Sequence, residues 1–438
     1  MRSKRRFNRA FVAGMAILAL FAAACGDDNG GSANAGDLSG QKVNVQGTEV
    51  GTEGEGVIAG FVPFEKDTGV DVVFSGSRDF ETNMRVAAEG GNLPDIAIFP
   101  QPGNVVSQQF ASHITPLPDD VVKTVEKNFD PYWSKLVTVN GKVMGLPVKA
   151  DVKSLVWYSP KTFKAKGYKV PTTWDQLIKL QNQIKTDGGT PWCVGIESGD
   201  ATGWPFTDWV EDIMLRLNGP DVYDQWVQHK IPFDDPKVKE VVKMVGDIWF
   251  PAGNVLGGRS AIASTGFGSA GLPILTGGCL MHRQGNFFSA NFKSNKPDVK
   301  FGEDGDVNAF YLPTMNDKFG DVLLTGGAYA VAFNDKPATM ATLRFMASTA
   351  YPNARITANK GGYLSPNKEH DTSLYADELD RTFAKILVNA NPVRFDASDL
   401  MPGEVGAGSF WKEGTNYVSG AIDVDTFVSR VEKSWPKQ

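Results

Sequence analysis

The chain has 438 residues, of which 44 are Lys or Arg and 50 are Asp or Glu, giving a net charge of −6 at pH 7. Five of the basic residues and no acidic residue fall within positions 1–24, so the remainder carries a net charge of −11. A chain this acidic, with no basic stretch in its body, is not expected to bind nucleic acid. The roughly 400 residues of the body exceed what one hydrophobic core usually holds, so we expect two lobes.

Residues 1–24 have the features of a bacterial export signal. A basic start is followed by an uncharged run at 11–24, which is too short to span a bilayer comfortably. Three alanines then precede Cys25. An ordinary secretory signal does not need this cysteine, whereas a lipoprotein signal does, because the thiol receives the lipid. We therefore predict a lipoprotein signal peptide at 1–24, lipidation of Cys25 and a flexible, small and polar tether at 25–40. The alternative is a plain signal peptide with an incidental thiol.

Two further cysteines, Cys193 and Cys279, then remain in a compartment where thiols oxidise. We predict a disulfide between them, and the alternative is two separately buried thiols. Two cysteines cannot complete a zinc site, and the four histidines show no ligand spacing with them. No metal site is expected.

The first part of the body alternates strands and helices. Strand patterns occur at 42–47, 70–74 and 95–99, and helical patterns at 52–67, where Pro63 should introduce a kink, and 79–89. This β-α-β-α-β order predicts a parallel sheet. Ligands bind beyond the carboxyl ends of such strands. The candidate loops are therefore 48–53, 75–79 and 100–103.

The remaining elements are less regular. Strands are expected at 141–148, 154–158, 191–198 and 323–333, and helices at 338–348 and 423–435. Thr173 and Gln176 form a capping-box pattern that predicts a helix to about residue 185.

Motifs for enzyme chemistry are weak. The G-x-G-x-x-G at 266–271 has no strand before it and no acidic residue at the required distance after it, so we interpret it as a loop and expect no cofactor. The carboxylate neighbours Glu53 and Glu55, or Asp119 and Asp120, cannot face each other across a glycosidic bond. There is no G-x-S-x-G motif. We expect no catalytic residue and no enzyme activity.

Aromatic residues are more informative. The body contains all 10 Trp of the chain, several of them beside Gly, Pro or an acidic residue. A sugar ring presents C–H groups to an aromatic ring and hydroxyls to carboxylates and guanidinium groups, so sugar sites combine these side chains. Trp204, flanked by Gly203 and Pro205, is a candidate for such a site, although most Trp residues belong to a core.

Three segments, at 77–103, 191–213 and 277–288, resemble the extracellular solute-binding proteins (family 1) of carbohydrate ABC importers, and most of all the α-glucoside-binding branch. The resemblance extends from about Lys42 to the end of the chain. It implies a two-lobed α/β fold of the periplasmic-binding-protein type (type II) with a ligand cleft between the lobes. The N-terminal lobe would comprise 41–150 and 320–364, and the C-terminal lobe 151–319 and 365–438. Cysteines also stand at the positions of Cys193 and Cys279 in this branch.

The resemblance also implies a set of ligand-binding residues. They are Arg78, Asp79, Asp151, Trp204, Phe206, Gln284, Gly326, Gly327, Tyr363 and Trp411. Phe206 stands where the branch often has a smaller residue, so its ring could shorten the pocket.

The implied function is that of a monomeric, lipid-anchored receptor outside the cytoplasm. It would capture a sugar, such as an α-glucoside or another di- or oligosaccharide, and deliver it to a membrane permease driven by an ATPase. Two alternatives stay open: an anchored sugar-processing enzyme, and a binding protein for a peptide, polyamine or polyol phosphate. A phosphate ligand would favour an Arg or Lys cluster, which the sequence does not show.

Overall fold

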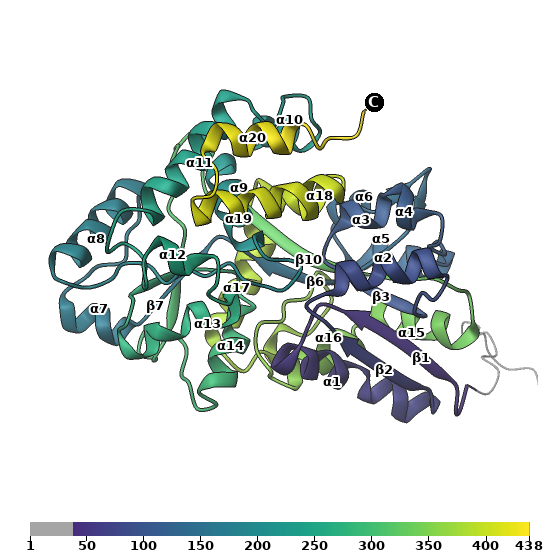
Figure 1. Ribbon diagram of the computed structural model, residues 1–438. Coiled ribbons are helices and arrows are strands. Elements are labelled where there is room, and N and C mark those ends of the chain that lie inside the picture. The colour runs from purple at the N-terminus through teal and green to yellow at the C-terminus, as the bar shows by residue number, and fades with distance from the viewer. Residues whose placement is uncertain (1–37, 438) are drawn as a thin grey trace, which may run out of the picture. The chain divides into compact units, whose positions relative to one another are not determined.

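The computed structural model describes residues 38–437 (Figure 1). The predicted signal peptide, the lipidation site Cys25 and the tether up to residue 37 lie outside the described residues. Among those described, no helix is long and apolar enough to cross a membrane.

The larger sheet has the strand order β11-β10-β3-β1-β2, and β6 pairs with β10 on its other side. The strands are β1 (Lys42–Gly47), β2 (Asp71–Gly76), β3 (Ile96–Phe99), β6 (Leu146–Val152), β10 (Leu323–Ala332) and β11 (Val393–Phe395). β1 runs parallel to both β2 and β3, as the β-α-β-α-β pattern predicts, whereas β10 is antiparallel to β3 and β6. β10 is buried along its whole length, which agrees with its nearly continuous apolar sequence.

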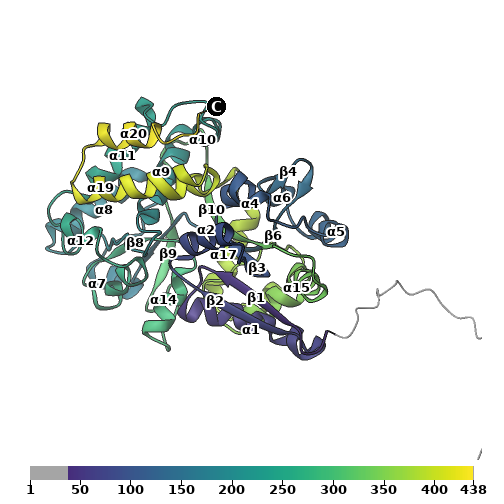
Figure 2. The ribbon, with the colours of Figure 1, turned by 45° about the vertical axis from the view of Figure 1, so that its right-hand side comes forward.

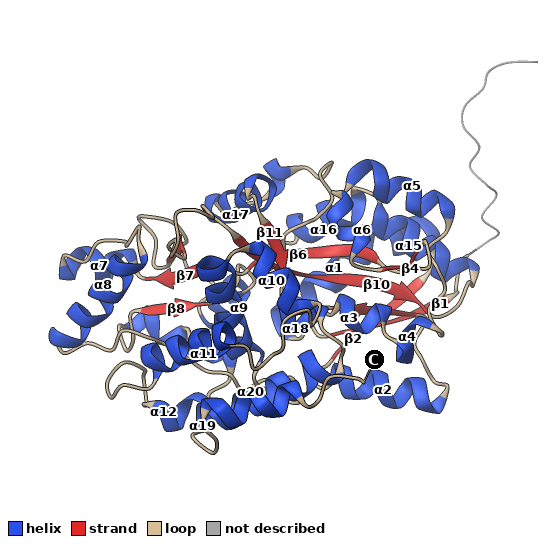
Figure 3. Cartoon of the chain, turned by 90° about the horizontal axis from the view of Figure 1, so that it is seen from above, coloured by secondary structure: helices blue, strands red, loops and turns tan. Residues whose placement is uncertain are grey.

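A smaller antiparallel sheet has the order β8-β7-β9. Its strands are β7 (Leu155–Tyr158), β8 (Met281–Arg283) and β9 (Asn308–Tyr311), and a separate hairpin joins β4 (Thr138–Val139) to β5 (Lys142–Val143). Figure 3 shows the two sheets as separate groups of strands, each with its own helices. The fold is thus two-lobed and of mixed α/β type.

Helices surround both sheets (Figures 1 and 2). Around the larger sheet lie α1 (Gly51–Thr68), α2 (Phe80–Gly90), α3 (Pro102–Val106), α4 (Gln108–Ala111), α5 (Asp119–Asn128), α6 (Pro131–Lys135), α15 (Pro337–Ala347), α16 (Ala350–Thr357) and α17 (Glu378–Asn389). The other helices are α7 (Pro160–Lys166), α8 (Trp174–Thr186), α9 (Trp204–Asn218), α10 (Pro220–Val227), α11 (Pro236–Trp249), α12 (Arg259–Ile262), α13 (Phe267–Ala270), α14 (Phe288–Asn295), α18 (Ala397–Leu400), α19 (Trp411–Ser419) and α20 (Val424–Glu432), with 3₁₀ turns η1 (Leu272–Thr276) and η2 (Thr372–Leu374) and a π-helical segment η3 (Glu404–Phe410).

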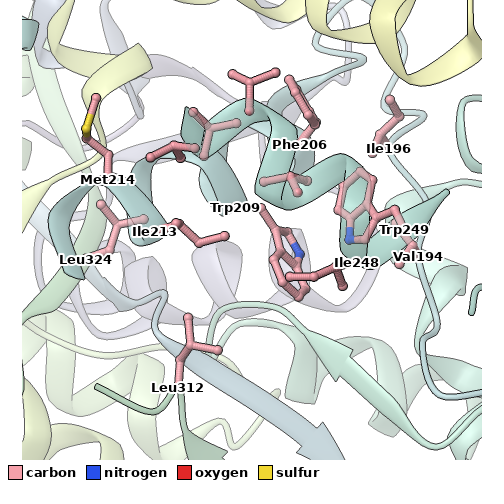
Figure 4. Packing of buried hydrophobic residues seen from close by; sticks show 14 of the residues in the cluster. Val194, Ile196, Phe206, Trp209, Ile213, Met214, Ile248, Trp249, Leu312 and Leu324 are labelled. Atoms are coloured by element: carbon pink, nitrogen blue, oxygen red, sulfur yellow. The ribbon is translucent and has the colours of Figure 1, made fainter. Parts of the chain in front are cut away.

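We call the larger sheet with its helices the first lobe, and the smaller sheet with its helices the second lobe. The helix α9 lies at the centre of the hydrophobic core of the second lobe (Figure 4). Every residue from Pro205 to Arg216 is buried. Trp209 packs edge to face against Trp192 and Trp249, with ring centroids 5.1 and 5.7 Å apart. A helix buried on all sides must also bury its polar residues, which in α9 include Asp208, Glu211 and Asp212.

Several local predictions are corrected. Residues 191–198 form isolated bridges rather than a regular strand, because their N–H groups bond to three different segments, at Asn254, Met281 and Thr265. The G-x-G-x-x-G stretch contains the single helical turn α13 rather than a loop. The helix predicted at 52–67 is confirmed as α1, which contains Pro63, and the kink at Pro63 stays a prediction.

Other local predictions hold. The Thr173 hydroxyl accepts the N–H of Gln176 at the start of α8, although the Gln176 side chain accepts from Thr172 instead of completing the box. Cys193 and Cys279 form a disulfide within a hydrophobic cluster, and both are buried. The lobe boundaries stay a prediction; β11 pairs with the larger sheet although its residues fall in the range expected for the C-terminal lobe.

Candidate ligand-binding site

A cavity with an empty volume of about 770 Å³ lies at the carboxyl ends of β1, β2 and β3. Its lining from the larger sheet and its helices includes Thr48, Glu49, Glu53, Arg78, Glu81, Pro100, Gln101, Lys149, Asp151 and Gly327, and the lining from the rest of the chain includes Lys153, Ser198, Ala201, Trp204, Phe267, Phe287, Asp396, Asp399 and Trp411. All three loops expected from the strand order contribute to it.

The strand β6 and the residue after it supply one charged wall. Lys149, Asp151 and Lys153 alternate along the chain, and this two-residue period brings all three to the cavity. The Lys149 ammonium lies 3.7 Å from the Asp151 carboxylate. Burial raises the pKa of Asp151, although Lys149 and Lys153 oppose it. One oxygen of Asp151 is buried and has no hydrogen-bond partner in the described part of the chain, so it is available to a ligand donor.

The first turn of α1 adds Glu53 to this wall. Its carboxylate lies 3.5 Å from Lys149 and 3.8 Å from Arg78. Burial raises the Glu53 pKa, and the two cations oppose that effect. Since these contacts are longer than good hydrogen bonds, the charged groups retain capacity for a bound hydroxyl.

Lys153 is held by two buried carboxylates. Its ammonium donates to Asp208 of α9 at 2.9 Å and to Asp396, which precedes α18, at 2.5 Å. Burial raises the pKa of Asp208 to about 7, whereas Lys153 and hydrogen bonds from its neighbours outweigh burial and lower that of Asp396. Asp208, Glu211 and Asp396 are close enough to hold a metal ion. We assign them no metal, because Lys153 is paired with Asp208 and Asp396 and Arg283 with Asp208. Glu211 accepts the N–H groups of Ala397 and Ser398.

Three aromatic rings form the opposite side. Trp204 lies edge to face with Phe267 at 5.0 Å and tilted against Phe287 at 5.9 Å. A cation lies over each ring: Lys153 over Trp204, and two others from the first lobe, Arg78 over Phe267 and Lys149 over Phe287. Because Arg78 and Lys149 reach across from the larger sheet, these contacts connect the two lobes at the cavity.

A fourth ring, Trp411, begins α19 directly after the π-helical segment η3. Such segments are frequent at functional sites. The indole N–H donates to the Ser398 hydroxyl at 3.2 Å, which fixes the ring at the cavity wall. The backbone of Gly203 has a φ of +116°, and a Cβ there would lie 2.3 Å from the Trp411 carbonyl oxygen. Glycine is therefore required for the start of α9 to approach Trp411.

Five of the ten predicted residues line the cavity: Arg78, Asp151, Trp204, Gly327 and Trp411. The others do not. Asp79 lies at the start of α2, next to Gly199, and Gln284 is buried with its side chain accepting the N–H of Gly285. Gly326 faces the aliphatic part of Lys153, where a Cβ would come within 2.6 Å.

The remaining two have other neighbours. Phe206 is fully buried in the core, with its ring centroid 5.9 Å from those of Trp249, Tyr417 and Phe427 (Figure 4). Its ring thus does not shorten this cavity. Tyr363 donates its hydroxyl to the Val148 carbonyl at 3.1 Å and lines a smaller recess beside the cavity.

Most of the charged lining was not predicted from the sequence. Lys149 and Lys153 could have been found from the alternation along β6, and Glu49 and Glu53 from their place in the first candidate loop. Phe267 and Phe287 gave no such signal, because each is brought to Trp204 only by the packing of α13 and α14.

The chain matches known proteins over most of its length. Residues 47–351 match the bacterial extracellular solute-binding protein family. The osmoprotective compounds-binding protein GgtB of Synechocystis sp. is 39% identical over 405 residues, which are 92% of this chain and 94% of GgtB. The alpha-glucosides-binding periplasmic protein AglE of Rhizobium meliloti is 36% identical over 413 residues, 91% of this chain and 88% of AglE.

Solved structures agree on the fold. A chitin oligosaccharide binding protein has a TM-score of 0.75 at 18% identity, over 90% of this chain and 97% of the other. The bacterial solute receptor AcbH has a TM-score of 0.72 at 18% identity, with the same coverage. The chain belongs to the bacterial extracellular solute-binding protein family.

Proposed function

We propose that this chain is the substrate-binding lipoprotein of an ABC importer and that it captures a neutral sugar, such as an α-glucoside or another di- or oligosaccharide. The observation that carries the proposal is a cavity in which the rings of Trp204, Phe267 and Phe287 face a wall of carboxylates and cations. Rings match the C–H face of a sugar, and the charged wall matches its hydroxyls. The names of GgtB and AglE, which refer to osmoprotective compounds and to α-glucosides, agree with this class.

Among osmoprotective compounds, a quaternary ammonium solute is disfavoured by the same rings. Such a cation binds over ring faces that carry no other charge. Here Lys153, Arg78 and Lys149 lie 5.5, 4.7 and 5.3 Å from the three ring centroids. A second cation would be repelled, whereas a neutral ring would not.

The binding step would be followed by transfer to a membrane permease without covalent chemistry. Contacts across the two lobes at Arg78 and Lys149 support a mechanism in which closure buries the ligand and the permease recognises the closed form. Cys25 would anchor the monomeric receptor to the membrane through its lipid. Three carboxylates of the cavity, those of Glu53, Asp151 and Asp396, are paired with neighbouring cations, which suits binding better than proton transfer.

Calorimetry on the purified chain tests the proposal with trehalose, maltose and sucrose, with cellobiose as a β-linked comparison and glycine betaine as a quaternary ammonium solute. We expect saturable binding of at least one α-glucoside and none of glycine betaine. Binding of glycine betaine without any sugar would overturn the proposal. A prolonged incubation with each sugar, followed by assay for released monosaccharide, separates a receptor from an anchored enzyme.

A further inference from the structure

A small recess with an empty volume of about 270 Å³ lies beside the cavity, and Glu53 and Lys149 line both. Its far side is formed by Arg355 of α16 and Tyr363, with the backbone of Gly361 and Gly362. None of these four residues lines the main cavity. The recess therefore extends the site towards groups that the rest of the site does not use.

Arg355 is held rigidly at this position. Its guanidinium lies 4.1 Å from the centroid of the Tyr363 ring, and only 4% of the residue is exposed. Its aliphatic part crosses α1 at Gly60, where a Cβ would come within 2.7 Å of the Arg355 Cγ. A larger residue at Gly60 would displace the arginine, so the two helices are built to bury it.

Two donor groups of Arg355 make no hydrogen bond among the described residues, although the Tyr351 side chain lies close to the guanidinium. Its Nε and Nη1 atoms are buried and make no hydrogen bond. A buried donor without a partner destabilises the fold, and a charged one does so more strongly. Such a pair of N–H groups is the kind of feature that a ligand oxygen satisfies.

Acceptors without donors occur on the neighbouring wall. Both carboxylate oxygens of Glu49 are buried without a hydrogen-bond partner in residues 38–437, and the residue is 4% exposed. Glu49 lines the main cavity and is close enough to Arg355 to act on its charge, although no hydrogen bond joins them. The unused acceptors thus belong to the lining of the cavity, and the unused donors belong to a residue of the recess that adjoins it.

A hydroxyl group matches this arrangement, because it accepts from an N–H and donates to a carboxylate at the same time. An anionic group could accept hydrogen bonds from Arg355 but would be repelled by the carboxylates of Glu49 and Glu53. An ammonium group could donate to these carboxylates but would meet Arg355 and Lys149.

We propose that the ligand places a neutral hydroxyl group against Arg355 and Glu49, and that these two residues select neutral sugars over charged derivatives of the same sugars. The proposal rests on the sugar-binding function above and names the part of the site that enforces neutrality. Arg355 repels a cationic ligand and Glu49 repels an anionic one, so substitution of each residue should change the affinity for a different charged derivative.

The test is a charge series on one scaffold, measured by calorimetry. The probes are trehalose and maltose, each as the parent sugar and as derivatives in which one primary hydroxyl is replaced by hydrogen, an amine or a phosphate. For the parent that binds, we expect both charged derivatives to bind at least about 10-fold more weakly. A phosphate or amine derivative that binds as tightly as its parent overturns the proposal.

Two substitutions assign the selectivity. Arg355→Met should weaken binding of the parent sugar about 10-fold and reduce the ratio of its affinity to that of the amine derivative. Glu49→Gln should reduce the ratio of the parent's affinity to that of the phosphate derivative. Arg355→Lys keeps the positive charge but removes the fork of N–H donors. It should therefore weaken binding of the parent sugar, while the amine derivative should still bind more weakly than the parent. This variant also serves if Arg355→Met does not fold. Arg344→Met, which removes an exposed arginine paired with Asp120, is the matched control and should change nothing.

The outcomes separate the two proposals. If Arg355→Met and Glu49→Gln both prefer the parent sugar over its charged derivatives as strongly as the wild type does, the proposed role of these residues is wrong. The sugar-binding function would not be affected by that result. If the wild-type chain binds no sugar at all, the proposed function itself fails.

Discussion

Ser154 and Asp212 are joined by a hydrogen bond of 2.9 Å between the serine hydroxyl and the carboxylate, and the same hydroxyl accepts the N–H of Leu324 at 3.0 Å. Ser154 lies where the chain passes from β6 of the larger sheet to β7 of the smaller one, and Leu324 lies near the start of β10 after the return. A third passage, after β11, is held by Glu211 through the N–H groups of Ala397 and Ser398. The buried acidic residues of α9 therefore connect the three segments on which any movement of the lobes depends.

Asp212→Ala should destabilise the protein by about 3–5 kcal/mol, since the substitution leaves Arg216 and Arg283 buried without this partner. Urea denaturation of the purified variant measures the loss. The control is Asp120→Ala, which breaks the exposed pair with Arg344 and should cost less than about 1 kcal/mol. Equal effects of the two substitutions would contradict a structural role for the α9 network.

The sequence predicted the elements whose pattern is local. The β-α-β-α-β unit, the strand at β10 and the helix ends at Thr173 and Asp423 follow from alternation and capping. Segment 191–198 was misassigned because its apolar residues are buried by several loops rather than by one strand partner. Half of the predicted site residues reach the cavity. The charged wall was overlooked although Lys149, Asp151 and Lys153 alternate along the chain, and the carboxylates of Asp208 and Asp396 reach Lys153 only in the folded chain.

Trp204→Ala should weaken sugar binding by about 1–3 kcal/mol with little change in stability, because this ring is partly exposed and faces Phe267 and Phe287 in the cavity. Calorimetry on the variant with the best-bound α-glucoside measures the effect. Trp174→Ala is the matched control: Trp174 is also partly buried but packs on the core of the second lobe. Wild-type affinity in Trp204→Ala would show that the ligand does not contact this ring. Trp411→Ala and Asp151→Ala are expected to act in the same direction.

The Cys193–Cys279 disulfide joins residues 86 positions apart. In the chain-entropy account a loop of this length stabilises the fold by roughly 4–5 kcal/mol. The double variant Cys193→Ser/Cys279→Ser should melt several degrees lower, yet bind sugar at low temperature, because neither cysteine lines the cavity. Differential scanning calorimetry and binding assays check the two parts. An unchanged melting temperature would exclude a stabilising role, and iodoacetamide labelling of both thiols in the native wild-type protein would exclude the bond.

Cys25→Ala should abolish lipid attachment, leaving the protein either released or with an uncleaved signal. Metabolic labelling with a radioactive fatty acid in the producing bacterium measures this directly. Cys193→Ser, which leaves Cys25 in place, is the control and should retain the label. Label retained by Cys25→Ala would contradict the prediction that Cys25 is lipidated. The proposed sugar binding by the body of the chain does not depend on that result.

The carboxyl of Asp380, on α17, gives a prediction about pH. Burial raises its pKa from 3.8 to about 7, with Asp377 adding to the shift and Lys293 and Arg381 opposing it. Because the folded-state pKa lies above the unfolded one, the contribution of this group to stability is fully present below about pH 4 and is lost as the pH rises through about 7. Asp380→Asn keeps the shape and cannot ionise, so it should match the wild type near pH 4 and exceed it near pH 8, by an amount on the order of 1–3 kcal/mol. Urea denaturation at both pH values measures the difference. Asp377→Asn, which removes the 2.8 Å ion pair with Lys293, should show no such gain at pH 8. If Asp380→Asn is less stable than the wild type at pH 8, the fold stabilises the charged carboxylate, and folding lowers the pKa of Asp380 instead of raising it.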